Sequence, residues 1–241
     1  MPDVSRRLND GWGRFGDSAR RGSCHPRIEA IVFDAEGVVV DTEPAWDRAQ
    51  EVLLARRNLA YDREAVKPLL TGRSLTEGTA VLRDTYGLVE DVAALARERA
   101  ELVSAALAEE ATLIPGFGPF FDAVRGLFRV ALATSLDPGL LAPLDRRLGL
   151  SDLFDGQIYT LAREDLRGKP YPDLFLQAAA GLAVPPARCL VIEDAPNGVE
   201  AARRAGMRCF GLATTHGTEK LRMADRIFDD FADIPLDRLG S

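Results

Sequence analysis

The stretch that decides the fold reads IEAIVFDAEGVVVDTEP and spans residues 28–44. Its first apolar run ends at Phe33 and is followed by Asp34, Glu36 and Gly37. A carboxylate at the tip of a buried strand is costly unless it is paired or binds a ligand. The pattern therefore indicates a functional site at the end of this strand, although taken alone Asp34 could simply cap a turn.

Further short apolar runs follow, each separated from the next by a longer helical pattern, at residues 130–133, 157–159, 189–192 and 209–212. This alternation is typical of βαβ units and predicts an α/β fold built around a parallel sheet. In such sheets the ligand lies beyond the carboxyl ends of the strands. We therefore expect the polar residues that follow the strands to meet Asp34 there. They are Thr134 and Ser135 after one run and Glu193 and Asp194 after another.

A long segment, residues 43–111, shows helical periodicity and no strand pattern. We predict that it forms a helical cap inserted into a core made of residues 28–42 and 112–241. The cap would leave and re-enter the core near Asp34, so it can lie over the site as a lid. Residues 1–27 are predicted to form a disordered tail.

The composition argues against several classes of protein. A net charge of -7 and a pI of about 5.0 do not suit a non-specific nucleic-acid binder, which needs a positive surface. No window approaches the roughly 18 to 20 apolar residues of a membrane helix, and the N-terminal residues lack the apolar segment of a secretory signal. The 3 cysteines are widely spaced and offer no metal clip. We therefore expect a cytoplasmic globular protein that binds neither nucleic acid nor membranes.

The acidic residues suit phosphoryl transfer. A carboxylate at a strand end can attack phosphorus when a divalent ion and a cation neutralise the phosphoryl oxygens, and Asp34 suits that role. Glu36 could give a proton to the leaving oxygen and later take one from water. Asp194, helped by Glu193, could hold Mg²⁺ together with Asp34, because this ion prefers oxygen ligands. The alternative for Glu193 and Asp194 is capping of the helix that follows them.

Two further features could hold a phosphoryl group. Thr134 and Ser135 precede a helix expected to begin near Pro138, where a hydroxyl and free backbone N–H groups bind anions, but they could equally be helix caps. Lys169 is one of only 3 lysines against 27 arginines. Its identity therefore indicates a site that needs a compact ammonium rather than a planar guanidinium. The alternative is a surface lysine with no special role.

The order of these motifs resembles that of the haloacid dehalogenase superfamily of phosphatases and mutases. The matching segments are FDAEG with Asp34, ALATS with Thr134, GKPYPD with Lys169, and VIEDAPNGVEAARRAGM with Glu193 and Asp194. The match covers about residues 28–228. The resemblance implies a Rossmann-like core, an inserted helical cap, bound Mg²⁺ and a covalent phospho-aspartate on Asp34.

The cap carries further matches. Thr71-Gly72-Arg73-Ser74 is similar to the substrate-facing loop of the subgroup that includes β-phosphoglucomutase and phosphoglycolate phosphatase. This similarity implies that Arg73 reaches the distal group of the substrate, and that Thr42 lies at the hinge of the cap and takes part in substrate binding. Trp46 stands where the hexose-phosphate mutases have a histidine, which favours a hydrolase over a mutase. Trp46 and Arg73 are expected to influence the choice of substrate, although Trp46 could also simply fill the core of the cap.

Glu36 departs from the family pattern, because the phosphatases and mutases carry aspartate there. In the family this position contributes its backbone carbonyl to the metal, so Mg²⁺ binding need not suffer. Proton transfer is more sensitive, because it needs heavy atoms about 2.6 to 3.2 Å apart and an error of about 1 Å can cost roughly a hundredfold. We therefore predict slow turnover or an unusual leaving group.

The sequence as a whole predicts a Mg²⁺-dependent phosphatase that acts on a small phosphorylated metabolite, such as a sugar phosphate. A phosphomutase is the nearest alternative. A dehalogenase, which needs no metal, is disfavoured by the presence of Glu193 and Asp194. A phosphate-binding or regulatory protein that has lost turnover is an alternative of another class.

Overall fold

The computed structural model describes residues 26–71, 73–162 and 166–239. The predicted disordered tail, residues 1–27, lies almost entirely outside the described residues, because these begin at residue 26. Gly72 of the predicted substrate loop also lies outside the described residues. No helix within the described ranges is long and apolar enough to cross a membrane.

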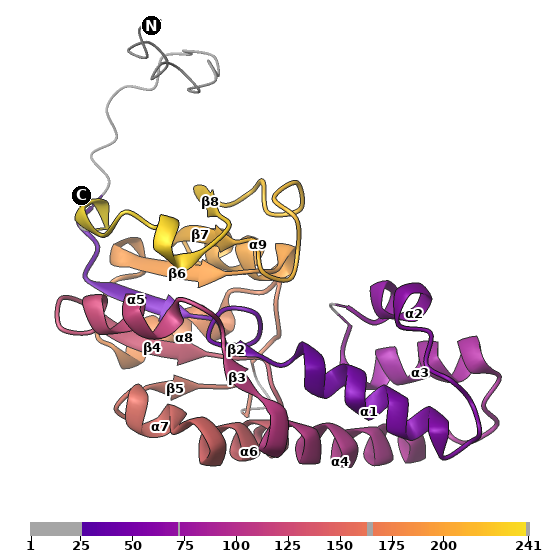
Figure 1. The fold of residues 1–241 in the computed structure, drawn as a ribbon. Coiled ribbons are helices and arrows are strands. Elements are labelled where there is room, and N and C mark those ends of the chain that lie inside the picture. The colour runs from indigo at the N-terminus through magenta and orange to yellow at the C-terminus, as the bar shows by residue number, and fades with distance from the viewer. Residues whose placement is uncertain (1–25, 72, 163–165, 240–241) are drawn as a thin grey trace, which may run out of the picture.

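A parallel sheet forms the centre of the molecule (Figure 1), which confirms the predicted α/β class. Strand β1 lies between β4 and β6, and the strand order is β5-β4-β1-β6-β7-β8. The chain therefore builds outward from β1 on one side and then on the other, and the ligand of such a sheet lies at this switch point. The strands are β1 Ala30–Phe33, β4 Arg129–Ala133, β5 Ile158–Tyr159, β6 Cys189–Glu193, β7 Arg208–Leu212 and β8 Arg226–Phe228.

Helices cover both faces of the sheet. Successive side chains of a buried strand point to opposite faces, so each face is apolar and packs against its own layer of helices. Ile31 and Phe33 of β1 point into one core, and Ala30 and Val32 point into the other. The first core is rich in phenylalanine and is closed by α5 Phe117–Val124, α6 Pro138–Leu148 and α7 Leu150–Leu153. The second is closed by α8 Asp173–Gly181 and α9 Pro196–Arg204. Short 3₁₀ helices span Pro186–Arg188, Phe231–Asp233 and Leu236–Arg238.

Four helices stand to one side of the sheet (Figure 1), and we call them the helical group. They are α1 Glu43–Ala55, α2 Arg63–Leu70, α3 Leu75–Tyr86 and α4 Val92–Glu110. Leu53, Val66, Leu70 and Leu82 form a small core of their own. The helical group is joined to the sheet through β2 Val40–Asp41 and β3 Thr112–Leu113, which pair antiparallel. This two-stranded ribbon fixes where the helical group begins and ends, next to the carboxyl end of β1.

Candidate active site

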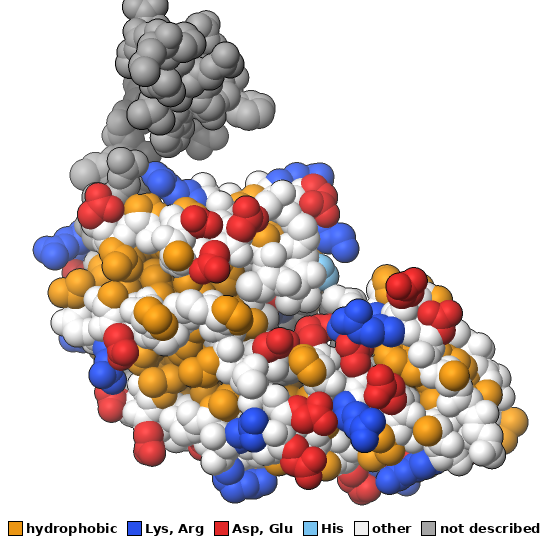
Figure 2. Space-filling model, in the orientation of Figure 1, with side chains coloured by type: hydrophobic (Ala, Val, Ile, Leu, Met, Phe, Trp, Pro, Cys, Tyr) orange, Lys and Arg blue, Asp and Glu red, His pale blue; other side chains and the backbone are white. Residues whose placement is uncertain are grey.

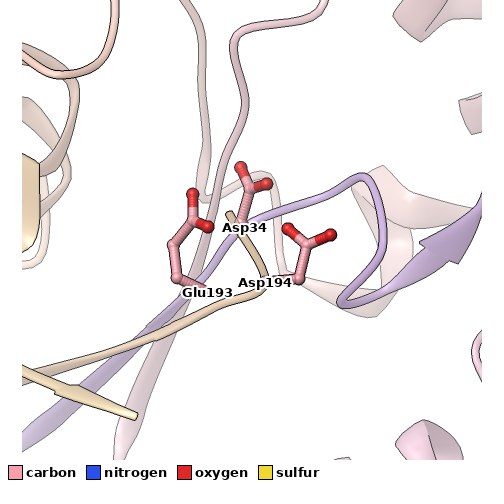
Figure 3. Close-up of side chains that lie close together, drawn as sticks. All are labelled: Asp34, Glu193 and Asp194. Atoms are coloured by element: carbon pink, nitrogen blue, oxygen red, sulfur yellow. The ribbon is translucent and has the colours of Figure 1, made fainter. Parts of the chain in front are cut away.

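Three carboxylates meet at the carboxyl ends of β1 and β6. Asp34 follows β1 directly, Glu193 ends β6 and Asp194 is the next residue. The two strands are parallel neighbours, so residues far apart in the chain come side by side. Each side chain has an oxygen within 4.8 Å of an oxygen of both others, and Figure 3 shows the carboxylates gathered beyond the strand ends. All three residues are buried, with exposed fractions of 7%, 0% and 4% in chain order.

Lys169 supplies a positive charge to this cluster. Its Nζ lies 2.6 Å from Oδ1 of Asp34 and 2.5 Å from Oε1 of Glu193. Burial alone would lower the pKa of Lys169, but the charges of Asp34 and Glu193 outweigh burial and raise that pKa above its usual value. The ammonium therefore stays protonated and ties the two strand ends together.

One ammonium does not neutralise three carboxylates. Burial raises the pKa of Asp34 to about 6, despite the opposing charge of Lys169. Burial is the main cause that raises the pKa of Asp194 well above its usual value, and the negative charges of Glu193 and Asp34 raise it further. The hydrogen bond of Asp194 to Thr215 opposes this increase. Asp194 forms no ion pair with any residue that the structure describes. The oxygens of Asp34 and Asp194 therefore fit a hard divalent cation such as Mg²⁺, which would relieve this excess negative charge.

Glu193 is held on both of its oxygens. Oε1 accepts from Lys169, and Oε2 accepts from the backbone N–H of Ala195 at 2.6 Å. A Cβ on Gly198, in the first turn of α9, would lie 1.7 Å from Oε1, so α9 presses against the carboxylate. Glu193 therefore orients Lys169 and the start of α9, and Asp34 and Asp194 are the better placed of the three to hold a metal.

The turn after β1 also closes on the cluster. Gly37 has a φ of +73°, and a Cβ there would lie 2.0 Å from Oδ2 of Asp194. Only glycine adopts this backbone without strain and leaves room for the carboxylate. The carbonyl of Gly37 accepts a hydrogen bond from the hydroxyl of Thr214, which fixes the turn beneath the site.

Glu36 is anchored to the helical group rather than to the acidic cluster. Its Oε1 accepts from Oγ1 of Thr42 at 2.9 Å and from Nε1 of Trp46 at 3.1 Å. Its Oε2 has no hydrogen-bond partner among the described residues, and Glu36 lines the central cavity. Burial raises the pKa of Glu36, although the two hydrogen bonds oppose this. One oxygen is thus fixed, while the other is available for proton transfer.

The sequence predicts Thr42 and Trp46 at the substrate, and nothing in it indicates their bonds to Glu36. Both residues do line the cavity. They lie on the same side of α1, because Thr42 is its N-cap and the backbone N–H of Trp46 donates to the carbonyl of Thr42. The length of glutamate is what brings its carboxylate within reach of the indole, and only the folded turn between β1 and α1 reveals this.

Thr134 and Ser135 follow β4, on the other side of β1 from β6. Thr134 is buried, and its Oγ1 accepts from the backbone N–H of Leu136 at 3.1 Å. Its hydroxyl hydrogen is therefore free to point at an anion. Ser135 is exposed on the cavity wall, next to the start of α6.

A cavity of about 1220 Å³ lies between the sheet edge and the helical group. Its floor contains the acidic cluster, Lys169 and Thr134, and its opposite wall contains Trp46, Gln50, Arg73 and Arg99. Arg73 is exposed, and its Nε donates to the carbonyl of Leu69 at 2.7 Å. Arg99 was missed in the sequence, because α4 reads as an alanine-rich helix with arginines scattered along it. Gln50 of α1 was missed because no motif in the sequence marks this polar residue.

The chain matches a known family. The model of the family described as haloacid dehalogenase-like hydrolase matches residues 28–206. Fructose-1-phosphate phosphatase YqaB of Escherichia coli K12 is 32% identical, over 76% of this chain and 95% of the relative. Protein CbbY of Cereibacter sphaeroides is 34% identical, over 86% of this chain and 94% of the relative.

Solved structures show the same fold. One is a haloacid dehalogenase family hydrolase from Deinococcus radiodurans, determined with bound phosphate and sodium. It aligns with a TM-score of 0.71 and 29% identity, over 86% of this chain and 93% of that chain.

Proposed function

This chain belongs to the haloacid dehalogenase-like hydrolases, as a phosphomonoester hydrolase, and on that premise we propose that it hydrolyses a small phosphorylated metabolite through an aspartyl-phosphate on Asp34. The observation that carries the proposal is the meeting of Asp34, Asp194 and Lys169 at one edge of the sheet. Isolated carboxylates at strand ends would be caps. A buried group of three carboxylates that shares one ammonium suits a centre for phosphoryl transfer.

In the first step an oxygen of Asp34 attacks phosphorus, which forms an O–P bond and breaks the bond from phosphorus to the ester oxygen. Lys169, held by Glu193, lies beside Asp34 and stabilises the negative charge of the phosphoryl oxygens, with the hydroxyl groups of Thr134 and Ser135 on the other side. Asp34 and Asp194 would hold Mg²⁺, which would supply further positive charge to the phosphoryl oxygens. The leaving oxygen takes a proton from Glu36.

In the second step Glu36, now ionised, accepts a proton from a water molecule. That water forms a bond to phosphorus, the bond to Asp34 breaks, and inorganic phosphate leaves. The raised pKa of Glu36 supports its first role, because a protonated fraction persists nearer to neutral pH. Its anchored Oε1 restricts how far the carboxyl group can swing, so we expect proton transfer to favour a narrow set of leaving groups.

We propose that the helical group acts as a cap over residues 28–42 and 112–241. The cavity between the two supports this, because residues of both line it. Exclusion of bulk water from such a cavity strengthens the charge interactions within it.

The test is release of inorganic phosphate from fructose 1-phosphate, 2-phosphoglycolate and a nucleoside monophosphate, each with and without Mg²⁺. We expect release from at least one ester, dependent on Mg²⁺ and abolished in Asp34→Asn. If Asp34→Asn releases phosphate as fast as the wild type, Asp34 is not the nucleophile. If these esters bind but none is cleaved, the chain is a phosphate-binding protein and the proposal fails.

We propose hydrolysis rather than phosphomutase activity. The N–H group of Trp46 is engaged with Glu36, whereas the resemblance implies a histidine here in the hexose-phosphate mutases. The ³¹P NMR spectrum of the protein mixed with β-glucose 1-phosphate distinguishes the mutase from the hydrolase. A mutase produces glucose 6-phosphate, whereas a hydrolase produces inorganic phosphate.

A further inference from the structure

Arg99 of α4 is a buried cation with neutral partners. The residue is 3% exposed. Its Nε donates to Oε1 of Gln50 at 3.1 Å, and its Nη1 donates to the carbonyl of Leu75 and to Oγ1 of Thr79, both at 3.3 Å. The guanidinium carbon lies 5.0 Å from the centre of the Trp46 ring. None of these groups carries a formal negative charge.

No carboxylate among the described residues pairs with Arg99. Burial lowers the pKa of Arg99 to about 10, so the side chain is still charged at neutral pH. Buried charges are normally paired, because removing an ion from water is expensive. Arg99 is therefore a buried positive charge in the helical group without a carboxylate partner among the described residues.

Several other cations of the helical group are paired with carboxylates. Lys67 of α2 lies 2.5 Å from Glu43 and 2.8 Å from Asp47. Figure 2 shows acidic and basic side chains interspersed over α1 and α2. The unpaired state of Arg99 is thus a feature of its position and not a general shortage of acids in this part of the chain.

The guanidinium of Arg99 faces the cavity. Arg99 is one of the residues that line it, and Nη2 has no hydrogen-bond partner among the described residues. A Cβ on Gly78 would lie 3.0 Å from Nη1, so a glycine at this point of α3 leaves room for the guanidinium. Gln50, Thr79 and the ring of Trp46 hold the side chain in place, which leaves a pre-oriented donor on the cavity wall.

Resting on the phosphatase function proposed above, we infer that Arg99 binds a second anionic group of the substrate, a carboxylate or a second phosphate, while the scissile phosphoryl group lies at Asp34. A planar guanidinium suits both of these anions. Trp46 contacts Glu36 through its N–H group and Arg99 through its ring, so a single side chain separates the two ends of the site. The substrate is therefore a compact ester with a negative charge at each end. This assigns to Arg99 the distal contact that the sequence suggested for Arg73.

The test is calorimetric binding to the Asp34→Asn protein in Mg²⁺, which needs no turnover. Two matched pairs of ligands are compared: 2-phosphoglycolate with 2-hydroxyethyl phosphate, and fructose 1,6-bisphosphate with fructose 1-phosphate. We expect the ligand with the second anion to bind at least about tenfold more tightly in one pair or both, as a charge-assisted bond to a buried guanidinium predicts. The pair that responds tells carboxylate from phosphate. Equal affinities within both pairs overturn the inference.

Variants of Arg99 in the same Asp34→Asn background tie the preference to this residue. Arg99→Gln should reduce the preference to within about twofold, and Arg99→Lys should keep part of it. Arg97→Gln is the matched control, since Arg97 is an exposed arginine of the same helix, and it should keep the full preference. Equal weakening of both ligands of a pair by Arg99→Gln would mean a structural role only and would overturn the inference. Should Arg99→Gln fail to fold, the ligand pairs and Arg99→Lys still decide.

The two proposals fail in different ways. Absence of phosphate release by the wild type would refute the phosphatase function and leave a binding preference at Arg99 measurable. Phosphate release without any preference for the second anion would refute the role of Arg99 alone.

Discussion

The contact between Gly198 and Glu193 predicts a large effect from adding a single methyl group. In Gly198→Ala the new Cβ would lie 1.7 Å from Oε1 and 2.0 Å from the carboxyl carbon of Glu193. The carboxylate cannot move aside freely, because it is fully buried and bonded to Lys169 and to the N–H of Ala195. Overpacking costs about 1 to 3 kcal/mol, and breaking one side of a buried ion pair costs about 3 to 5 kcal/mol.

We therefore expect Gly198→Ala to lower the free energy of unfolding by about 3 kcal/mol, or the melting temperature by about 6 to 12 °C for a chain of this size. Phosphate release should fall too, since Lys169 would lose the partner that orients it. Gly118→Ala is the control: Gly118 also lies in the first turn of a helix, α5, and its Cβ would meet nothing within 4 Å. Gly118→Ala should raise the free energy of unfolding by up to about 1 kcal/mol. Urea unfolding followed by circular dichroism measures both. Wild-type stability and turnover in Gly198→Ala would refute the close packing of α9 against the carboxylate of Glu193.

Three further outcomes follow from the site. Glu36→Asp shortens the acid by one methylene, so the shorter side chain loses its bonds to Thr42 and Trp46. Phosphate release should fall about tenfold or more. Faster release by the variant would show that glutamate at this position slows turnover. Mg²⁺ at a hundredfold excess over its Kd should raise the free energy of unfolding of the wild type by about 2.7 kcal/mol, measured in thermal melts. Asp194→Asn should lose this stabilisation by Mg²⁺. Equal stabilisation of the variant and the wild type would show that Asp194 does not bind the ion. Without metal, the raised pKa of Asp34 means that the folded state holds its proton more tightly than the unfolded state, so this stabilisation is full below about pH 4 and disappears as the pH rises through about 6. The stability of the wild type relative to Asp34→Asn in EDTA should thus fall by up to about 3 kcal/mol between about pH 4 and pH 7, and a flat or rising difference would contradict that pKa.

The sheet and the meeting of its acidic residues follow from a local rule. Apolar runs of 4 residues identify the buried strands β1, β4 and β6, and the rule that parallel strands present their carboxyl ends at one edge brings Asp34 and Asp194 together. Lys169 was singled out because lysine is rare in this chain. The structure places these residues in contact or close together, and their catalytic roles stay predictions.

Other features depend on contacts that no local pattern contains. Strand β8 and the β2–β3 ribbon are only 2 or 3 residues long, too short for alternation to be read. The bonds from Thr42 and Trp46 to Glu36 depend on the path of the turn between β1 and α1. The unpaired state of Arg99 depends on which groups of two other helices, α1 and α3, surround it, and charge counting along the sequence cannot show that.

The chemical identity of the covalent intermediate tests the role of Asp34 as nucleophile. The wild type and Asp34→Asn are mixed with acetyl phosphate and Mg²⁺, quenched in acid within a single turnover, digested, and examined by mass spectrometry. If Asp34 is the nucleophile, the wild type will carry one added phosphoryl group on Asp34, and this group will be absent without Mg²⁺ and absent in Asp34→Asn. Phosphate release with no phosphorylated Asp34 peptide, or a phosphoryl group carried by another residue, would contradict that role of Asp34.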